Sequence, residues 1–178
     1  MFEFTVDNDI CLCLVHESFA KDYVKLAKDN FEYLSKWLSW PEVCQTEEDF
    51  NKFIRDSLDK YDDGECMNCA IKYNGEIVGN IGFNVINHDV KKTDIGYWIS
   101  EEVQGRGIVT RSCRFLINYA FTELNLEKVQ IRAIKENLSS RAVCERLGMR
   151  LEGIITNCEK VGDRILDHAI YGIHRAET

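Results

Sequence analysis

The segment from Gln104 to Thr110 has the composition of an anion-binding loop. It reads Gln-Gly-Arg-Gly-Ile-Val-Thr and stands between a predicted strand and a predicted helix. Glycines in such a loop let successive backbone N–H groups point toward one place, and the N-terminus of the next helix adds positive potential there. Arg106 can add a full charge. A simple helix-entry turn is an equally good interpretation of two glycines alone, because short motifs are weak evidence.

A second group of polar residues, 135–149, also stands at a strand-to-helix junction. Taken alone, Asn137 or Ser139 would be an ordinary helix N-cap. In a strand-helix-strand crossover, however, both junctions lie at the carboxyl ends of neighbouring parallel strands, where open α/β sheets bind ligands. Position therefore predicts that the two segments border one site.

Hydrophobic periodicity predicts the elements that position these segments. Apolar residues predict a strand at 10–15, and helical spacing follows from Ser18 and again after a capping signal at 46–49. The remaining predicted strands are 67–73, 76–85, 93–99, 128–134, 151–158 and 164–173, with helices after Gly107 and at 137–147. This β-α-α-β-β-β-α-β-α-β-β order predicts a mixed α/β (α+β) layer sandwich, with an antiparallel first half and strands 93–99 and 128–134 as parallel neighbours.

Three turn signals support this division of the chain. Asn74-Gly75 and Gly162-Asp163 stand between pairs of predicted strands, as hairpin turns do. Gly148 follows the last residue of a predicted helix, where a left-handed cap is expected.

Length and charge restrict the class of protein. The chain has 178 residues, with 22 Lys and Arg against 30 Asp and Glu, a net charge of −8. This suits one domain and a cationic substrate, and it argues against direct binding of nucleic acid. The first Lys or Arg is Lys21, and the longest apolar run is far shorter than the roughly 20 residues that cross a bilayer. We therefore expect a cytoplasmic protein without a membrane partner.

The eight cysteines are expected to be free thiols in a reducing compartment. Cys66 and Cys69 have zinc or redox spacing, but no second Cys/His pair completes a zinc site. Residues three apart on a strand also point to opposite faces. Core thiols, and no metal, are the better prediction.

The chain resembles the GNAT superfamily of acetyl-CoA-dependent N-acetyltransferases, and within it the RimL-type enzymes that acetylate ribosomal-protein serine. The pyrophosphate loop of that family, Gln/Arg-x-x-Gly-x-Gly/Ala, is matched at Gln104 and Gly107, while Val109 stands where Gly or Ala is usual. Further matching segments are Leu38-Ser39-Trp40-Pro41, Thr46-Glu47-Glu48-Asp49, Ile95-Gly96-Tyr97-Trp98-Ile99, residues 137–148 and Leu151-Glu152-Gly153.

The resemblance implies a single acetyltransferase domain over residues 1–178. Its central sheet would be mixed, twisted and mostly antiparallel, with one splayed parallel strand pair and helices on both faces. The backbone of Ile99 and Ser100 would bind the pantetheine arm of acetyl-CoA, with Asn137 beside it. The pyrophosphate would be held by the N–H groups of Gln104, Gly105, Arg106, Gly107, Ile108, Val109 and Thr110.

The resemblance also assigns two catalytic residues. Glu159 would act as the base, through water, and Ser140 would donate a proton to the departing thiolate. Without the resemblance, Glu159 would be a solvated surface charge and Ser140 a helix cap. Cys113 and Cys144 are not expected to be nucleophiles, because the family transfers the acetyl group directly in a ternary complex and both lie on predicted core stripes.

The acceptor implied by the resemblance is the N-terminal α-amino group of a ribosomal protein, with a terminal serine expected. A small amine such as a polyamine or an aminoglycoside is an alternative, and so is a non-catalytic acetyl-CoA-binding module. Trp37, Trp40 and the segment 31–33 could be core residues or walls of the acceptor cleft. The acidic residues Glu47, Glu48, Asp49, Asp62 and Asp63 more simply form a solvated face than attract a cation. A homodimer is expected because similar proteins often form one.

Overall fold

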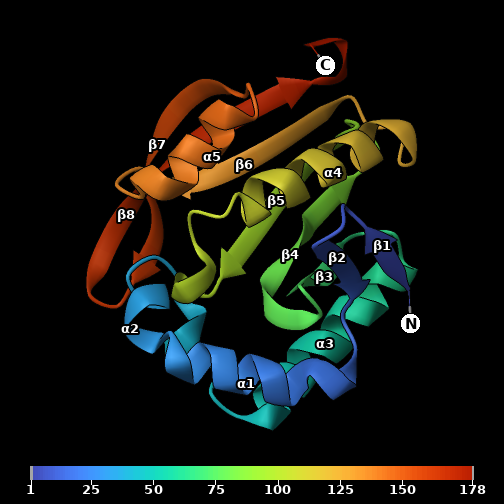
Figure 1. Ribbon diagram of the computed structural model, residues 1–178. Coiled ribbons are helices and arrows are strands. Elements are labelled where there is room, and N and C mark those ends of the chain that lie inside the picture. The colour runs from blue at the N-terminus through green and yellow to red at the C-terminus, as the bar shows by residue number, and fades with distance from the viewer. Residues whose placement is uncertain (1, 178) are drawn as a thin grey trace.

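The computed structural model describes residues 2–177 and consists of one eight-stranded sheet with helices on both faces (Figure 1). The strand order is β1-β2-β3-β4-β5-β6-β8-β7. The strands are β1 (Glu3–Thr5), β2 (Ile10–Leu14), β3 (Met67–Tyr73), β4 (Glu76–Asn87), β5 (Lys92–Ile99), β6 (Lys128–Ile134), β7 (Arg150–Val161) and β8 (Arg164–His174). The α-helices are α1 (Ala20–Asp29), α2 (Phe31–Leu34), α3 (Glu47–Asp62), α4 (Ile108–Thr122) and α5 (Leu138–Arg146).

Every neighbouring pair in the described sheet is antiparallel except β5 and β6, which are parallel. The predicted fold class and its parallel pair are therefore confirmed. The sequence pattern predicts neither β1 nor α2. Both are short, with three and four residues, and too few positions to show a period.

The parallel strands separate partway along their length. Their register runs from Lys92 opposite Lys128 to Ile95 opposite Ile131 and then stops. Beyond that point β5 continues against β4, and β6 continues against β8 (Figure 1). The part of β5 from Gly96 to Ile99 therefore has no strand partner on its β6 side, and the predicted splay is confirmed.

Two hydrophobic cores lie on opposite faces of the sheet. Alternation along the strands divides the residues, because neighbouring side chains point to opposite faces. Leu12 and Cys69 pack in the larger core with α4 and α5, whereas Cys13 and Ala70 pack in the smaller core with α1 and α3. The sheet is thereby held between two helical layers.

The local signals in the sequence are found at the expected places. Thr46 and Asp49 form a reciprocal capping box at the start of α3. Gly148 follows α5 with a positive φ of 74°. Asn74 and Gly75 both have positive φ between β3 and β4, as a tight hairpin turn requires.

The cysteines of the described chain are all free. Cys66 and Cys69 are buried, with exposures of 3% and 0%, as expected of core thiols. A group of three possible metal ligands, Glu3, Cys11 and Cys13, lies on β1 and β2. None of the described helices is both long enough and apolar enough to span a membrane.

Candidate active site

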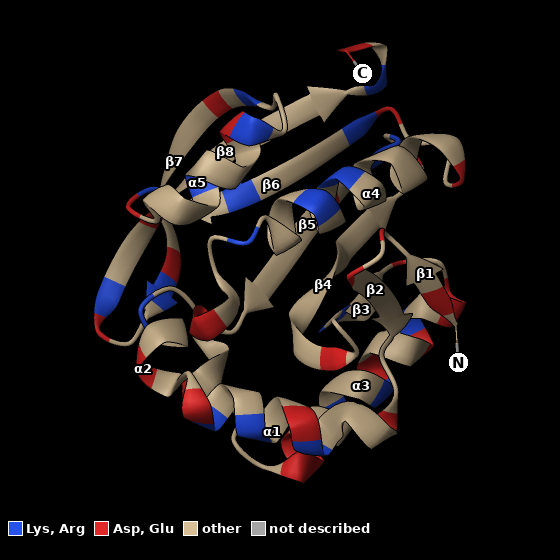
Figure 2. Cartoon of the chain, viewed as in Figure 1, with Lys and Arg blue, Asp and Glu red and all other residues tan. Residues whose placement is uncertain are grey.

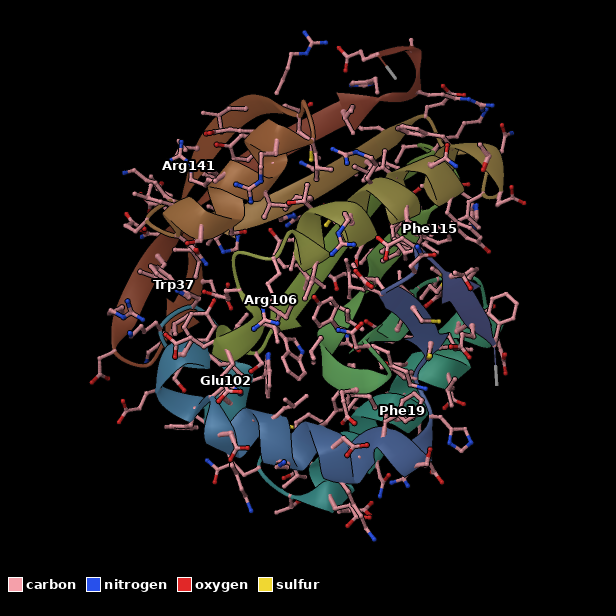
Figure 3. The ribbon with its side chains drawn as sticks, viewed as in Figure 1. Phe19, Trp37, Glu102, Arg106, Phe115 and Arg141 are labelled. Carbon is pink, nitrogen blue, oxygen red and sulfur yellow. The ribbon has the colours of Figure 1, made fainter. Side chains whose placement is uncertain are left out.

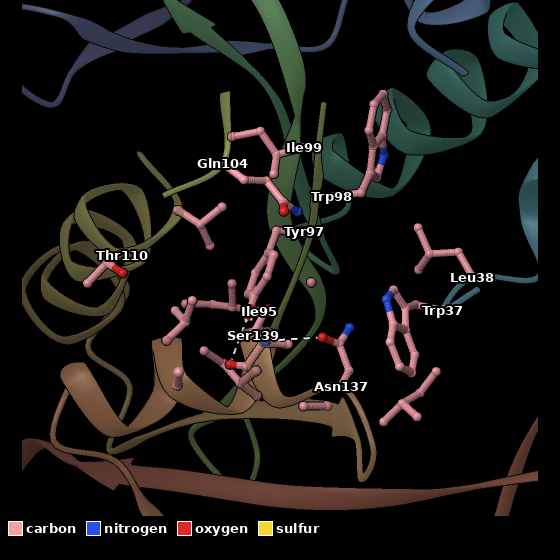
Figure 4. A pocket seen from close by; sticks show the side chains of 18 of the residues that line it. Trp37, Leu38, Ile95, Tyr97, Trp98, Ile99, Gln104, Thr110, Asn137 and Ser139 are labelled. Carbon is pink, nitrogen blue, oxygen red and sulfur yellow. Dashed lines mark hydrogen bonds between the residues drawn. The ribbon is translucent and has the colours of Figure 1, made fainter. Parts of the chain in front are cut away.

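A cleft of about 640 Å³ opens where β5 and β6 separate. Its walls come from α2 and the segment after it, the splayed part of β5, the loop into α4, the end of β6, α5 and the β7–β8 hairpin. Figure 4 shows Thr110 at one side of this space and Trp37 and Leu38 at the other, with Tyr97 and Ser139 between them. Segments far apart in the sequence therefore share one site.

The loop 104–110 forms a cradle of backbone donors at one end of the cleft. Gly105 and Gly107 each have a φ of 72°, a left-handed conformation that glycine adopts without strain. Within residues 2–177, the N–H groups from Gly105 to Thr110 have no hydrogen-bond acceptor, as is usual for the first turn of a helix. These donors and the N-terminus of α4 suit an anion such as a pyrophosphate.

Gln104 fixes the loop to the helical layer. Its Nε2 donates to the hydroxyl of Tyr33, and both residues line the cleft. Burial raises the pKa of Tyr33 above its ordinary value, so the hydroxyl keeps its proton at neutral pH.

Two of the predicted cofactor residues do not line the cleft. Arg106 turns its guanidinium to the carbonyl of Glu102, at 3.4 Å, and over the ring of Tyr73 (Figure 3). The amide of Ser100 donates to the carbonyl of Val78, at 2.8 Å. The other predicted cofactor residues, Ile99, Gln104, Gly105, Gly107, Ile108, Val109, Thr110 and Asn137, line the cleft.

Ladder geometry identifies which backbone groups of β5 face the opening. Successive residues of an antiparallel strand direct their N–H and C=O groups alternately to the two sides. Since Ser100 is bonded to β4, Ile99 and Tyr97 direct theirs toward the gap beside β6. The sequence analysis therefore named one of the two residues, Ile99, and missed the backbone of Tyr97.

Ser140 lies in the cleft with a hydrogen-bond partner that the sequence analysis missed. Its Oγ is 2.7 Å from the Tyr97 hydroxyl. Burial raises the pKa of Tyr97 well above its ordinary value, although the hydrogen bond to Ser140 opposes that shift. Tyr97 is therefore a neutral hydroxyl at physiological pH. Asn137 caps α5 by accepting from the Ser140 amide at 3.2 Å (Figure 4).

Glu159, on β7, also lines the cleft and is paired with His168. Its Oε2 is 3.0 Å from His168 Nε2, and its Oε1 accepts from Ser39 Oγ at 3.4 Å. The sequence motifs predict Glu159 but not His168. The Gly162-Asp163 turn could have revealed His168, because a hairpin in regular register places the two residues diagonally on one face.

Arg146 is a cation of the site that the sequence analysis also missed. Its Nε donates to Thr110 Oγ1 at 3.4 Å, beside the first turn of α4. Its positive charge thus adds to the potential of the backbone cradle.

Three further groups of residues have defined places in the structure. Trp37 lines the cleft, whereas Trp40 packs against Phe50 and Trp98 in the smaller core. Cys113 and Cys144 are fully buried, and burial raises the pKa of the Cys144 thiol to about 12. The predicted acidic residues lie on α3 or directly after it, and the same helix also carries Lys52, Arg55 and Lys60 (Figure 2).

Comparison with known proteins agrees with this geometry. Residues 12–150 match the acetyltransferase (GNAT) domain. The chain is 36% identical over 154 residues to the putative ribosomal N-acetyltransferase YdaF of Bacillus subtilis, which covers 86% of this chain and 84% of that protein. It is 30% identical over 166 residues to the ribosomal-protein-serine acetyltransferase of Escherichia coli, with 93% of each covered.

Two further similarities concern the acceptor and the cofactor. The spermidine N(1)-acetyltransferase of Escherichia coli is 29% identical over 133 residues, covering 74% of this chain and 68% of that protein. The crystal structure of RimL in complex with coenzyme A superposes with a TM-score of 0.93 at 25% identity, covering 97% of this chain and 98% of that one. Since the family match spans most of the sequence, the chain belongs to the GNAT family and is an acetyl-CoA-dependent N-acetyltransferase.

Proposed function

We propose that the enzyme acetylates the N-terminal α-amino group of a ribosomal protein, with serine as the terminal residue. Its similarity to the ribosomal-protein-serine acetyltransferase, over 93% of both chains, supports this acceptor class. The observation that carries the choice is the charge of the cleft. Of the described residues that line it, Glu159 is the only carboxylate.

One carboxylate suits an acceptor with one amine. A polyamine carries several ammonium groups, and each needs a carboxylate or another acceptor when it leaves water. The pKa values of the candidate amines also favour an N-terminal α-amino group. A free α-amino group has a pKa of about 7.7–8.0, whereas an alkylamine such as lysine is near 10.4, so only the former is readily neutral at physiological pH.

The residues of the cleft fit acetyl-CoA as the co-substrate. Amides from Gly105 to Thr110 would bind its pyrophosphate, and Gln104 would hold that loop in place. The free backbone groups of Ile99 would pair with the amides of the pantetheine arm, and Asn137 would lie beside it. When bound, the thioester supplies an activated acetyl group.

Two residues would then move protons. Glu159 acts as the base for the proton that leaves the amine, through a bridging group such as water, and Ser140 donates a proton to the departing sulfur. The Tyr97 hydroxyl, at 2.7 Å from Ser140 Oγ, can return a proton to that serine.

A comparison of acceptors tests this proposal. We expect kcat/KM for a peptide that begins with serine to exceed that for spermidine by about tenfold or more, since specificity is the ratio of these constants. The same peptide with a blocked N-terminus is the matched control and is expected to be inert. A higher kcat/KM for spermidine would overturn the ribosomal assignment and favour the small-amine alternative.

A further inference from the structure

His168 lies beside Glu159 in the cleft. The side chains of His168 and Glu159 are 15% and 32% exposed, and both line the cleft. The Nε2 to Oε2 distance of 3.0 Å is that of a hydrogen bond. The two groups therefore form a partly shielded pair in the wall of the cleft.

The β7–β8 hairpin has an irregularity next to the pair. Ile155 is opposite His168 and Glu159 is opposite Leu166, so β7 advances four residues while β8 advances two. Within this bulge Asn157 has a positive φ of 54°, and its amide donates to Asp167 Oδ1 at 3.2 Å. Bulges of this kind re-aim side chains next to active sites.

The pairing determines which nitrogen of the ring carries the hydrogen. An ionised carboxylate only accepts hydrogen bonds, so Nε2 must be the protonated nitrogen. In the neutral ring Nδ1 then has a free lone pair, and no residue within 2–177 is hydrogen-bonded to it. Ser39 binds the other oxygen of Glu159 and so holds the carboxylate in place.

The other charged groups near the pair have partners of their own, so Glu159 is the charged partner of His168. Arg132 and Arg146 also line the cleft, but Arg132 is paired with Asp94 at 2.9 Å and Arg146 binds Thr110. On β8 itself, Asp167 is paired with Lys135 at 3.6 Å. Other titratable groups of the cleft are the neutral phenols Tyr33 and Tyr97.

We propose that His168 is the group that bridges Glu159 and the acceptor amine. Its Nδ1 accepts the proton of the amine, and Glu159 is its positioning residue. As the bond from nitrogen to the acetyl carbon forms and the carbon–sulfur bond breaks, one N–H proton passes to Nδ1. Glu159 stabilises the resulting imidazolium. The sulfur takes its proton from Ser140, and both groups then exchange with solvent, which restores the starting protonation.

General acid–base chemistry favours an imidazole over a carboxylate for this step. A histidine side chain in water has a pKa of about 6.5 and a glutamate about 4.3, and the former is the closer match to an α-amino group. A carboxylate that fixes the tautomer and orientation of a histidine base is a recurrent arrangement. The inference rests on the proposed function only in requiring an amine acceptor.

The test is a double-mutant cycle. His168→Gln keeps an N–H donor for Glu159 but removes the base, and we expect kcat to fall about 100-fold with KM for acetyl-CoA unchanged. Glu159→Gln leaves the base in place, and we expect a smaller loss of about tenfold. The double variant should be no slower than His168→Gln, because the two residues act as a unit. Added imidazole should restore turnover to His168→Ala but not to Glu159→Gln.

A different pattern would overturn the inference. If His168→Gln keeps kcat within about threefold while Glu159→Gln loses the larger share, the carboxylate acts without the histidine. The thermal midpoint and KM for acetyl-CoA of each variant exclude misfolding as the cause. Each variant is assayed on both the serine peptide and spermidine. A preference for spermidine then refutes the acceptor assignment alone, whereas a retained rate in His168→Gln on the better acceptor refutes the role of His168.

Discussion

The Tyr97 hydroxyl lies 2.7 Å from Ser140 Oγ, across the gap between β5 and α5. The two residues are 43 positions apart in the sequence. Because burial keeps the phenol neutral, Tyr97 can donate to Ser140 over the whole physiological pH range.

Replacement of Tyr97 with Phe tests this contact. The variant retains the ring and removes only the hydroxyl, so Ser140 loses a hydrogen bond worth about 1 kcal/mol. We expect kcat to fall about fivefold to tenfold, with KM for acetyl-CoA nearly unchanged, in steady-state assays at neutral pH. A variant with wild-type kcat would show that the hydrogen bond has no part in turnover.

Gly107 offers a test of the backbone cradle. Its φ of 72° is costly for any residue with a Cβ, so Gly107→Ala should raise KM for acetyl-CoA severalfold as the loop shifts. Gly75→Ala is the matched control, because Gly75 has a φ of 86° in the β3–β4 turn and no atom within 4 Å of the added methyl group. We expect both variants to lose about 1–2 kcal/mol of unfolding free energy. Equal KM values for acetyl-CoA in the two variants would contradict the role of the loop 104–110 in binding the cofactor.

The two tryptophans of the α2–α3 connection should respond differently to truncation. Trp37→Ala should raise KM for the acceptor and leave the unfolding free energy almost unchanged, since Trp37 lines the cleft. Trp40→Ala should instead destabilise the fold by about 3 kcal/mol, because it removes a ring from an aromatic cluster. Urea unfolding and acceptor kinetics on both variants separate these effects. A loss of stability confined to Trp37→Ala would reverse the assignment.

The buried thiols predict a loss of stability in alkali. Burial raises the pKa of Cys69 and of Cys144 to about 12 each, whereas a thiol in the unfolded chain ionises near 8.5. The contribution of these thiols to the free energy of unfolding is complete below their pKa in the unfolded chain. It is lost as pH rises toward their pKa in the folded protein, because only the unfolded state releases protons in that pH range. Urea unfolding between neutral pH and about pH 10 should therefore show a falling free energy.

Cys144→Ala provides the control for the alkaline effect. The variant removes one titrating thiol, so its unfolding free energy should fall less steeply with pH than that of the parent. Identical slopes would mean that other groups cause the alkaline loss.

The sequence was most informative where periodicity and turn chemistry agree. The limits of β3 and β6 were predicted to the residue. β3 ends at the Asn74-Gly75 turn, and β6 carries the β-branched residues Val129, Ile131 and Ile134 at near-alternating positions. β1 was missed because two of its three residues are exposed and it forms only by pairing with β2. Short elements of this kind depend on tertiary contacts, which no local pattern records.

The segments that form the site could be predicted from the sequence, but the directions of individual side chains and backbone amides could not. The loop 104–110 and residues 137–140 meet at one cleft, as the crossover geometry required. The side chain of Arg106 turns away, and the amide of Ser100 is bonded within the sheet, because strand register and rotamer choice decide such directions. Register also decides the pairing of Glu159 with His168, which composition does not reveal.

The bulge in β7 also affects association between molecules. β7 is an outer strand of the sheet, and it exposes Leu151, Ile154 and Ile155 at 47%, 41% and 54%. A straight, apolar outer strand is a template for intermolecular pairing and aggregation, and a bulge interrupts that template. Removal of the two extra residues is therefore expected to reduce the solubility of the protein.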